Sequence, residues 1–155
     1  MKNSIIHLKN ILFVNAVVAL LLLSSCGGPQ PSQQVSDAEV NFASRRTYIL
    51  TGGDTEDAGL SGFQRDSFGA FFTGAINETL SKRGLTEVTD SRSDSADYII
   101  RYILRDKLIV TALDPESRRL IWRGQSDDRF VGAELSQETV SKLVKQAISG
   151  FPPRQ

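Results

Sequence analysis

Apolar residues recur at two different spacings along the chain. Three stretches alternate apolar and polar positions, which is the period of β-strands: residues 98–104, 108–113 and 120–124. Two stretches instead repeat apolar residues at every third or fourth position, which is the period of an amphipathic α-helix: residues 61–84 and 136–150. The pattern therefore predicts a fold that contains both helices and strands.

Both predicted helices carry signals at their ends. Ser61 and Gln64 have the spacing of a capping box, and Gly84 suits the left-handed residue that follows a helix. The second helix begins near Ser136 and ends before Gly150. The first apolar stripe comprises Phe68, Phe71, Phe72, Ala75, Ile76, Thr79 and Leu80, and the second comprises Val140, Leu143, Val144, Ala147 and Ile148. We expect both stripes to be buried, because one face of an amphipathic helix must be covered.

Further strands are predicted on both sides of the first helix. One covers residues 39–50, with a break near residues 43–44, and a short edge strand covers residues 85–89. Residues 51–60 are glycine-rich and acidic and predict a loop. The fold class expected is α+β: a two-layer sandwich in which two helices pack on one face of an antiparallel sheet of four to five strands.

The alternation assigns side chains to the two faces of the sheet. The face expected to receive the helices is apolar and carries Tyr98, Ile100, Tyr102, Leu104, Leu108, Val110, Ala112, Leu120, Trp122 and Gly124. The opposite face mixes isoleucine with basic residues and carries Ile99, Arg101, Ile103, Arg105, Lys107, Ile109, Thr111, Arg119, Ile121 and Arg123. Trp122 and Gly124 form a compact motif that we interpret as structural, since glycine beside a core aromatic permits close backbone packing.

The N-terminus has the pattern of an export signal. Lys2 and Lys9 precede an apolar run of 13 residues, 11–23, which only Asn15 interrupts, and Cys26 follows two serines. A helix that spans a bilayer needs about 20 apolar residues, so a cleaved signal is the better interpretation. The organisation predicted is a signal peptide at 1–25, a lipidated N-terminus with a flexible tether at 26–38, and one domain at 39–153.

The residues before Cys26, Leu-Ser-Ser, resemble the lipobox of bacterial lipoproteins. The resemblance implies that Cys26 is the lipid attachment site and that three acyl chains hold the protein to a membrane. Cys26 is followed by Gly27 and Gly28 and not by aspartate, which in such lipoproteins points to the outer membrane, on the periplasmic side. The alternative is an ordinary signal peptide with a chance cysteine.

Composition limits the chemistry of the mature chain. His7 and Met1 are the sole residues of their types, and Cys26 is the one cysteine. A mature domain without imidazole or free thiol cannot use a Ser–His or Cys–His nucleophile and lacks the usual zinc, copper or haem ligands, so we expect no enzyme, metal or cofactor. Removing Lys2 and Lys9 from the 18 basic residues leaves 16 against 18 acidic ones, which argues against a nucleic-acid partner.

Several segments resemble a bacterial lipoprotein family known as domain of unknown function 4136. The resemblance rests on residues 40–48 (VNFASRRTY), 80–84 (LSKRG), 96–100 (ADYII), 120–124 (LIWRG) and 147–153 (AISGFPP), and it spans residues 39–153. It implies the fold and an envelope location but no activity, because the role of the family is unknown. Family members often carry a long excursion where only residues 105–107 join two strands here.

Three functions are compatible with this pattern. The leading hypothesis is a non-enzymatic envelope module that binds a protein, glycolipid or murein partner through the Ile/Arg face, unless those arginines simply pair with nearby acids on a solvated sheet face. The alternative is a carrier that holds a lipid in a cavity between helices and sheet, lined by the phenylalanine stripe and the tyrosines of 98–104. A hydrolase built on Asp54, Asp97 or Asp114 ranks last. The match of Asp54, Glu56 and Gly59 to a calcium loop fails at Ala58 and Arg65.

Overall fold

The structure, a computed structural model, describes residues 35–55, 58, 60, 62–89, 96–130 and 136–152. The predicted signal peptide and Cys26 lie outside the described residues. The elements in chain order are β1 (Val35–Ser36), the 3-10 helix η1 (Phe42–Ser44), β2 (Thr47–Asp54), α2 (Gly62–Ser81), β3 (Thr86–Glu87), β4 (Tyr98–Leu104), β5 (Leu108–Leu113), β6 (Leu120–Gln125) and α3 (Gln137–Ala147). Within the described ranges, no helix is long and apolar enough to cross a membrane.

The strands form one six-stranded sheet in the order β1-β6-β5-β4-β2-β3. The prediction of an antiparallel sheet of four to five strands is wrong in two respects. The chain crosses over through α2, so β2 runs parallel to both β3 and β4, while the remaining pairs are antiparallel. The sheet also gains β1, which lies in a segment that the sequence predicted to be tether.

The first predicted strand is interrupted and displaced. The break expected near residues 43–44 is the helix η1, where the Asn41 side chain accepts a hydrogen bond from the Ala43 amide at 3.1 Å. The strand then continues through Gly53 to Asp54, where a loop was predicted. A Cβ atom on Gly53 would lie 1.9 Å from Cε2 of Tyr102, so glycine at this strand position makes room for the tyrosine ring.

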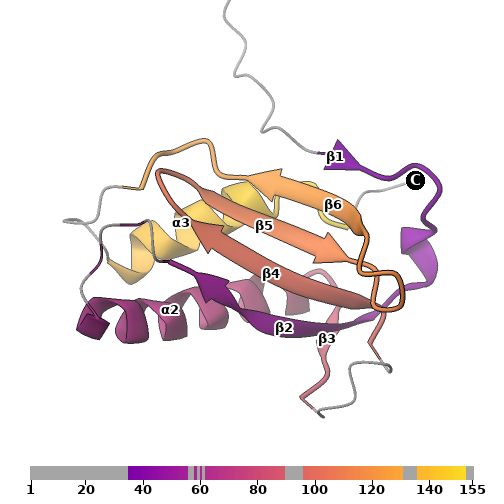
Figure 1. Ribbon diagram of the computed structural model, residues 1–155, viewed down its shortest axis with the longest axis horizontal. Helices are drawn as coiled ribbons and strands as arrows, with labels where there is room; N and C mark the ends of the chain where they lie inside the picture. The colour runs from indigo at the N-terminus through magenta and orange to yellow at the C-terminus, as the bar shows by residue number, and fades with distance from the viewer. Residues whose placement is uncertain are drawn as a thin grey trace, which may run out of the picture. The chain divides into compact units, whose positions relative to one another are not determined.

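Both helices lie on one side of the sheet (Figure 1), as predicted. Helix α2 packs against β2, β3 and α3, and α3 packs against β5 and β6. Phe72, Ile76 and Leu80 of α2 are buried, but Phe71 is 45% exposed, so its place in the predicted stripe is wrong. The buried residues are spaced four apart and form the stripe that faces the core, and Phe71 lies at the edge of that stripe.

The predicted ends of the helices agree with the structure where it describes them. Gly84, with φ of +80°, follows α2 in the left-handed region. The hydroxyl of Ser136 caps α3 by accepting a hydrogen bond from the Thr139 amide at 3.1 Å. All of the predicted stripe of α3 is buried, from Val140 to Ile148.

A bulge in β6 exchanges the faces of two neighbouring residues. Ala112 pairs with Trp122, whereas Leu113 pairs with Leu120, which leaves Ile121 as an extra residue in the strand. Ile121 is therefore 1% exposed and joins the core, while Leu120 is 43% exposed. The sequence predicted the reverse for both residues, because strict alternation holds only in a regular strand.

Trp122 and Gly124 lie where the sheet and α3 come closest. The Trp122 ring is buried with its centroid 4.7 Å from that of Phe151. A Cβ on Gly124 would lie 2.0 Å from the carbonyl oxygen of Ala147 and 2.4 Å from the Trp122 ring. This geometry agrees with the structural interpretation of the motif.

Candidate binding face on the open side of the sheet

The side of the sheet that faces away from α2 and α3 is not covered by any described helix (Figure 1), and we call it the open face. Strand register arranges its side chains in three rows that cross the strands. The first row is apolar, the second is mainly basic and polar, and the third has two central isoleucines with an acidic residue at one end and a polar residue at the other. The rows comprise Ile49, Ile99, Leu113 and Leu120; Arg101, Thr111 and Arg123 with Val35; and Asp54, Ile103, Ile109 and Gln125.

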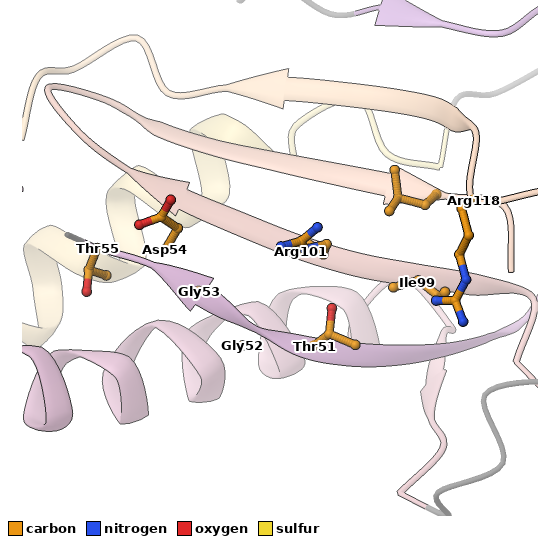
Figure 2. A pocket seen from close by; sticks show the side chains of 9 residues that line it. Thr51, Gly52, Gly53, Asp54, Thr55, Ile99, Arg101 and Arg118 are labelled. Atoms are coloured by element: carbon orange, nitrogen blue, oxygen red, sulfur yellow. The ribbon is translucent and has the colours of Figure 1, made fainter. Parts of the chain in front are cut away.

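A broad hollow of about 1000 Å³ lies on this face over β2, β4 and β5. Its lining includes Thr51 and Asp54 of β2, Ile99 and Arg101 of β4, and Arg118 from the turn between β5 and β6. Figure 2 shows Asp54 toward one end of the hollow, Arg118 at the other and Arg101 between them. The hollow therefore carries two guanidinium groups, and Ile99 and Leu113 are the large apolar residues of its lining.

Ile99 lies on the open face, where the alternation placed it, but its side chain is buried. The side chain is only 2% exposed although no described helix covers it. Its row neighbours Ile49 and Leu113 flank it, and the guanidinium group of Arg118 lies beside it (Figure 2). The apolar stem of an arginine can cover hydrophobic surface while its charged end stays in water.

The turn that positions Arg118 is closed by Asp114. The amide of Arg118 donates to the Asp114 carbonyl at 2.9 Å, and the amide and hydroxyl of Ser117 donate to its Oδ1 at 3.0 and 2.9 Å. The Ser117 amide hydrogen bond, helped by the Ser117 hydroxyl and by Arg45, lowers the pKa of Asp114 to about 2. The turn is followed directly by Arg118, which the sequence did not single out and which occupies the left-handed region with φ of 57°.

The predicted arginines of this face separate into two groups. Arg101 and Arg123 lie opposite Thr111 on β5 and so share the basic row. Arg119 instead pairs with Asp37 at 2.9 Å and holds the segment after β1 against β6. Arg105 is exposed in the short turn after β4, where its amide donates to the Lys107 carbonyl at 3.1 Å. The sequence predicted all four on one surface, and the structure brings only two of them together.

The carboxylates of the hydrolase hypothesis have structural partners. Burial raises the pKa of Asp97, but hydrogen bonds from the amides of Arg46 and Thr47, both at 2.8 Å, and from the Thr47 hydroxyl outweigh it and lower that pKa. Arg45 donates to the Asp97 carbonyl at 2.9 Å and pairs with Asp114 at 3.0 Å. Asp97 and Asp114 therefore stay ionised near neutral pH and fasten β2, β4 and the turn together, which does not suit a general acid.

The aromatic side chains that a lipid carrier would place around a cavity contact one another in the core. Phe72, Tyr98 and Tyr102, which were predicted to line a cavity, are all buried. Ring centroids lie 5.7 Å apart for Phe72 and Tyr102 and 5.2 Å apart for Tyr98 and Phe151. Among the residues that the structure describes, no group of three or more His, Cys, Asp or Glu side chains could hold a metal ion.

Comparison with solved structures supports the fold. PelC from Paraburkholderia phytofirmans, solved as a dodecamer, is similar with a TM-score of 0.57 and 11% identity, over 79% of this chain and 97% of that one. A family 4136 protein from Bacteroides thetaiotaomicron VPI-5482 has a TM-score of 0.52 and 11% identity, over 81% and 97%. A PDZ domain protein from Parabacteroides distasonis ATCC 8503 has a TM-score of 0.53 and 12% identity, over 81% of this chain and 36% of that one.

These likenesses concern the fold alone, because the identities are low. No protein-family model matches the sequence, and no curated protein matches it. The resemblance to domain of unknown function 4136, which the sequence motifs predicted, is confirmed by the fold that this chain shares with a member of that family.

Proposed function

We propose that this protein is a non-enzymatic binding or assembly module of the bacterial cell envelope. In this proposal acyl chains on Cys26 hold it to the outer membrane, and the domain faces the periplasm. The export pattern around Cys26 and the family resemblance support the location. The lack of His and free Cys after residue 26 supports a role without catalysis.

The observation that carries the binding role is the open face. A basic row that borders an apolar row on one side and two isoleucines on the other can partly desolvate an incoming group, which strengthens a charge-assisted hydrogen bond. Arginine suits such a surface, because its planar group is weakly hydrated and binds carboxylate or phosphate in a bidentate manner. The partner favoured by this chemistry is an envelope protein, glycolipid or murein segment that presents acidic groups on an apolar frame.

Photo-crosslinking in intact cells tests the binding role. A photoreactive residue at Thr111, in the basic row, should capture a partner, whereas the same residue at Ser81, at the exposed end of α2, should not. Charge reversal by Arg101→Glu and Arg123→Glu should abolish the Thr111 adduct. Equal adducts at both positions, or an adduct that survives both reversals, would contradict the proposal.

The anchor is tested separately. A Cys26→Ser chain should fail to incorporate radiolabelled palmitate, because serine has no sulfur to form the thioether that attaches the lipid. A Ser25→Ala chain serves as the control and should still be labelled. Unchanged labelling of the Cys26→Ser chain would refute lipid attachment at this residue.

Self-assembly is a second candidate function. PelC, which shares this fold, was solved as a dodecamer, and Val35 and Leu120 expose apolar side chains on the open face near β1 and β6. If copies of this chain associate there, Leu120→Glu should lower the mass measured by light scattering to that of a monomer. Phe71→Glu on α2 is the matched control, since it adds the same charge at an exposed apolar residue on the helix side.

A further inference from the structure

We propose that Arg101 and Arg118 form a site for an oxyanion, a phosphate or carboxylate group, in the hollow of the open face. This inference rests on the proposed binding function and deepens it by naming the chemistry of the ligand. Two features carry it: the backbone conformation at Arg118 and the surroundings of the two guanidinium groups.

Arg118 occupies a backbone position that ordinarily belongs to glycine or asparagine. Its φ of 57° places Cβ close to the neighbouring backbone, and this conformation is unfavourable for arginine as for most other L-residues. The hydrogen bonds that close the turn come from the Arg118 amide and from Ser117, so none of them uses the Arg118 side chain. A strained residue whose side chain the turn does not need is a feature of functional sites.

The strained conformation aims the side chain over the sheet. Figure 2 shows the Arg118 guanidinium beside Ile99, at the end of the hollow. Arg101 follows Ile99 by two residues on β4, so it lies on the same face at about 7 Å along the strand. The two cations therefore border one patch of surface with a buried isoleucine between them.

Neither guanidinium is neutralised within the part of the chain that the structure describes. Arg45 and Arg119 each pair with an aspartate at 3.0 and 2.9 Å, whereas Arg101 and Arg118 form no ion pair there. Two like charges on one patch of surface raise the local positive potential and favour an anion.

The other end of the hollow limits what can bind. Asp54 lines it at the end away from Arg118, and Thr51 lies between with its hydroxyl directed to the Ile100 carbonyl at 3.4 Å. A carboxylate repels a second anion, so the oxyanion should sit at the Arg118 end.

Calorimetric titration of the full chain in a non-ionic detergent tests the site. The probes are inorganic phosphate, glucose 1-phosphate and glycerophosphoglycerol, the soluble headgroup of phosphatidylglycerol. Saturable binding that Arg118→Met and Arg101→Met each weaken at least about tenfold is expected, because each variant removes a charge-assisted pair. Arg129→Met, at an exposed arginine that does not line this hollow, should stay within about twofold of the original chain.

The probes also separate the possible sources of the oxyanion. Tighter binding of glucose 1-phosphate assigns a phosphomonoester on a sugar, and tighter binding of glycerophosphoglycerol assigns a lipid headgroup. Either result supports the site if the arginine variants lose it. Absence of saturable binding to all three probes, or binding that both variants retain, would overturn the inference.

Arg118→Gly distinguishes a ligand role from a structural one. Glycine adopts positive φ without strain, so this variant should lose phosphate binding yet unfold at an equal or higher urea concentration. If Arg118 merely covers Ile99, Arg118→Gly should lower the urea midpoint and phosphate should never bind. Crosslinks at Thr111 without phosphate binding would overturn this site and leave the proposed function standing.

Discussion

The close contact between β6 and the end of α3 provides a direct test of the packing of the fold. Gly124 of β6 faces the end of α3, and its replacement by alanine adds one carbon atom. That Cβ would lie 2.0 Å from the Ala147 carbonyl oxygen and 2.4 Å from Cη2 of Trp122. The oxygen belongs to the helix backbone and the ring is buried, so neither can move aside as a flexible side chain does.

The cost follows from the displacement that the added atom requires. Carbon and carbonyl oxygen rarely approach within about 3.3 Å, so α3 would have to shift by about 1.3 Å relative to β6. The shift disturbs a stripe of buried side chains that includes Leu143 and Val144. Overpacking costs about 1–3 kcal/mol where neighbours adjust, so Gly124→Ala should lower the free energy of unfolding by about 3 kcal/mol or more.

Urea denaturation followed by circular dichroism measures this loss. With an m-value of about 1–3 kcal/mol per molar urea, the midpoint should fall by roughly 1–3 M. Gly74→Ala is the matched control, because Gly74 lies in α2 with no neighbour within 4 Å of its Cβ position. It should stabilise the protein by about 0.5–1 kcal/mol, since alanine is the better helix former. Equal effects of the two substitutions would refute the packing argument.

Two further predictions concern the turn and the end of α2. The folded pKa of Asp114, about 2, lies below its unfolded value of about 3.9, so the stability that Asp114 contributes is present above pH 4 and is lost as the pH falls toward 2. Asp114→Asn should therefore make the decline of the urea midpoint between pH 5 and pH 2 shallower, and an unchanged decline would contradict the assignment. Gly84→Ala should lower the free energy of unfolding by about 1–2 kcal/mol, measured in the same assay at pH 7, because φ at this residue is +80°; a gain in stability would contradict that expectation.

The sequence predicts the elements that have a regular period. Strands β4 and β5, both helices and the short strand β3 lie where alternation or helical spacing predicted them. Strands β4 and β5 and both helices bury one face, and burial imposes the period on their residues, whereas β3 is too short to show a period and has no buried residue. The prediction that the helices share one face of the sheet is confirmed for the same reason.

The predictions that fail depend on partners distant in sequence. Whether β2 runs parallel to β4 depends on the crossover through α2, which local pattern does not encode. The sequence predicts that Gly53 lies in a loop. It lies in β2 instead, where the Tyr102 ring occupies the space that a side chain at this residue would need. The path of β1 beside β6 likewise depends on the pairing of Asp37 with Arg119, two residues far apart in the chain.

The candidate site was predicted only in outline. Alternation identified a basic and apolar face and placed Arg101 and Arg123 on it correctly. The same spacing placed Arg119 on this face, but its guanidinium group forms an ion pair with Asp37 and so has a structural role. Arg118 lies in a turn, where apolar and polar residues do not alternate regularly, so the sequence pattern does not identify it. The one sequence signal for Arg118 is that the turn between β5 and β6 has no glycine at the residue that adopts positive φ.

Both irregularities of the open face arise in the hairpin that joins β5 and β6. The left-handed residue at its turn directs Arg118 back over the sheet, and the bulge two residues later moves Leu120 outward and Ile121 into the core. A regular hairpin would leave Ile99 uncovered and would place Leu120 under the helices. Because the same few residues set one cation over the hollow and the apolar side chain beside it, the binding proposed for this face should depend on the hairpin as well as on Arg101 of β4. Substitutions at Arg118 and Leu120 should therefore change binding while the helix-covered core stays intact.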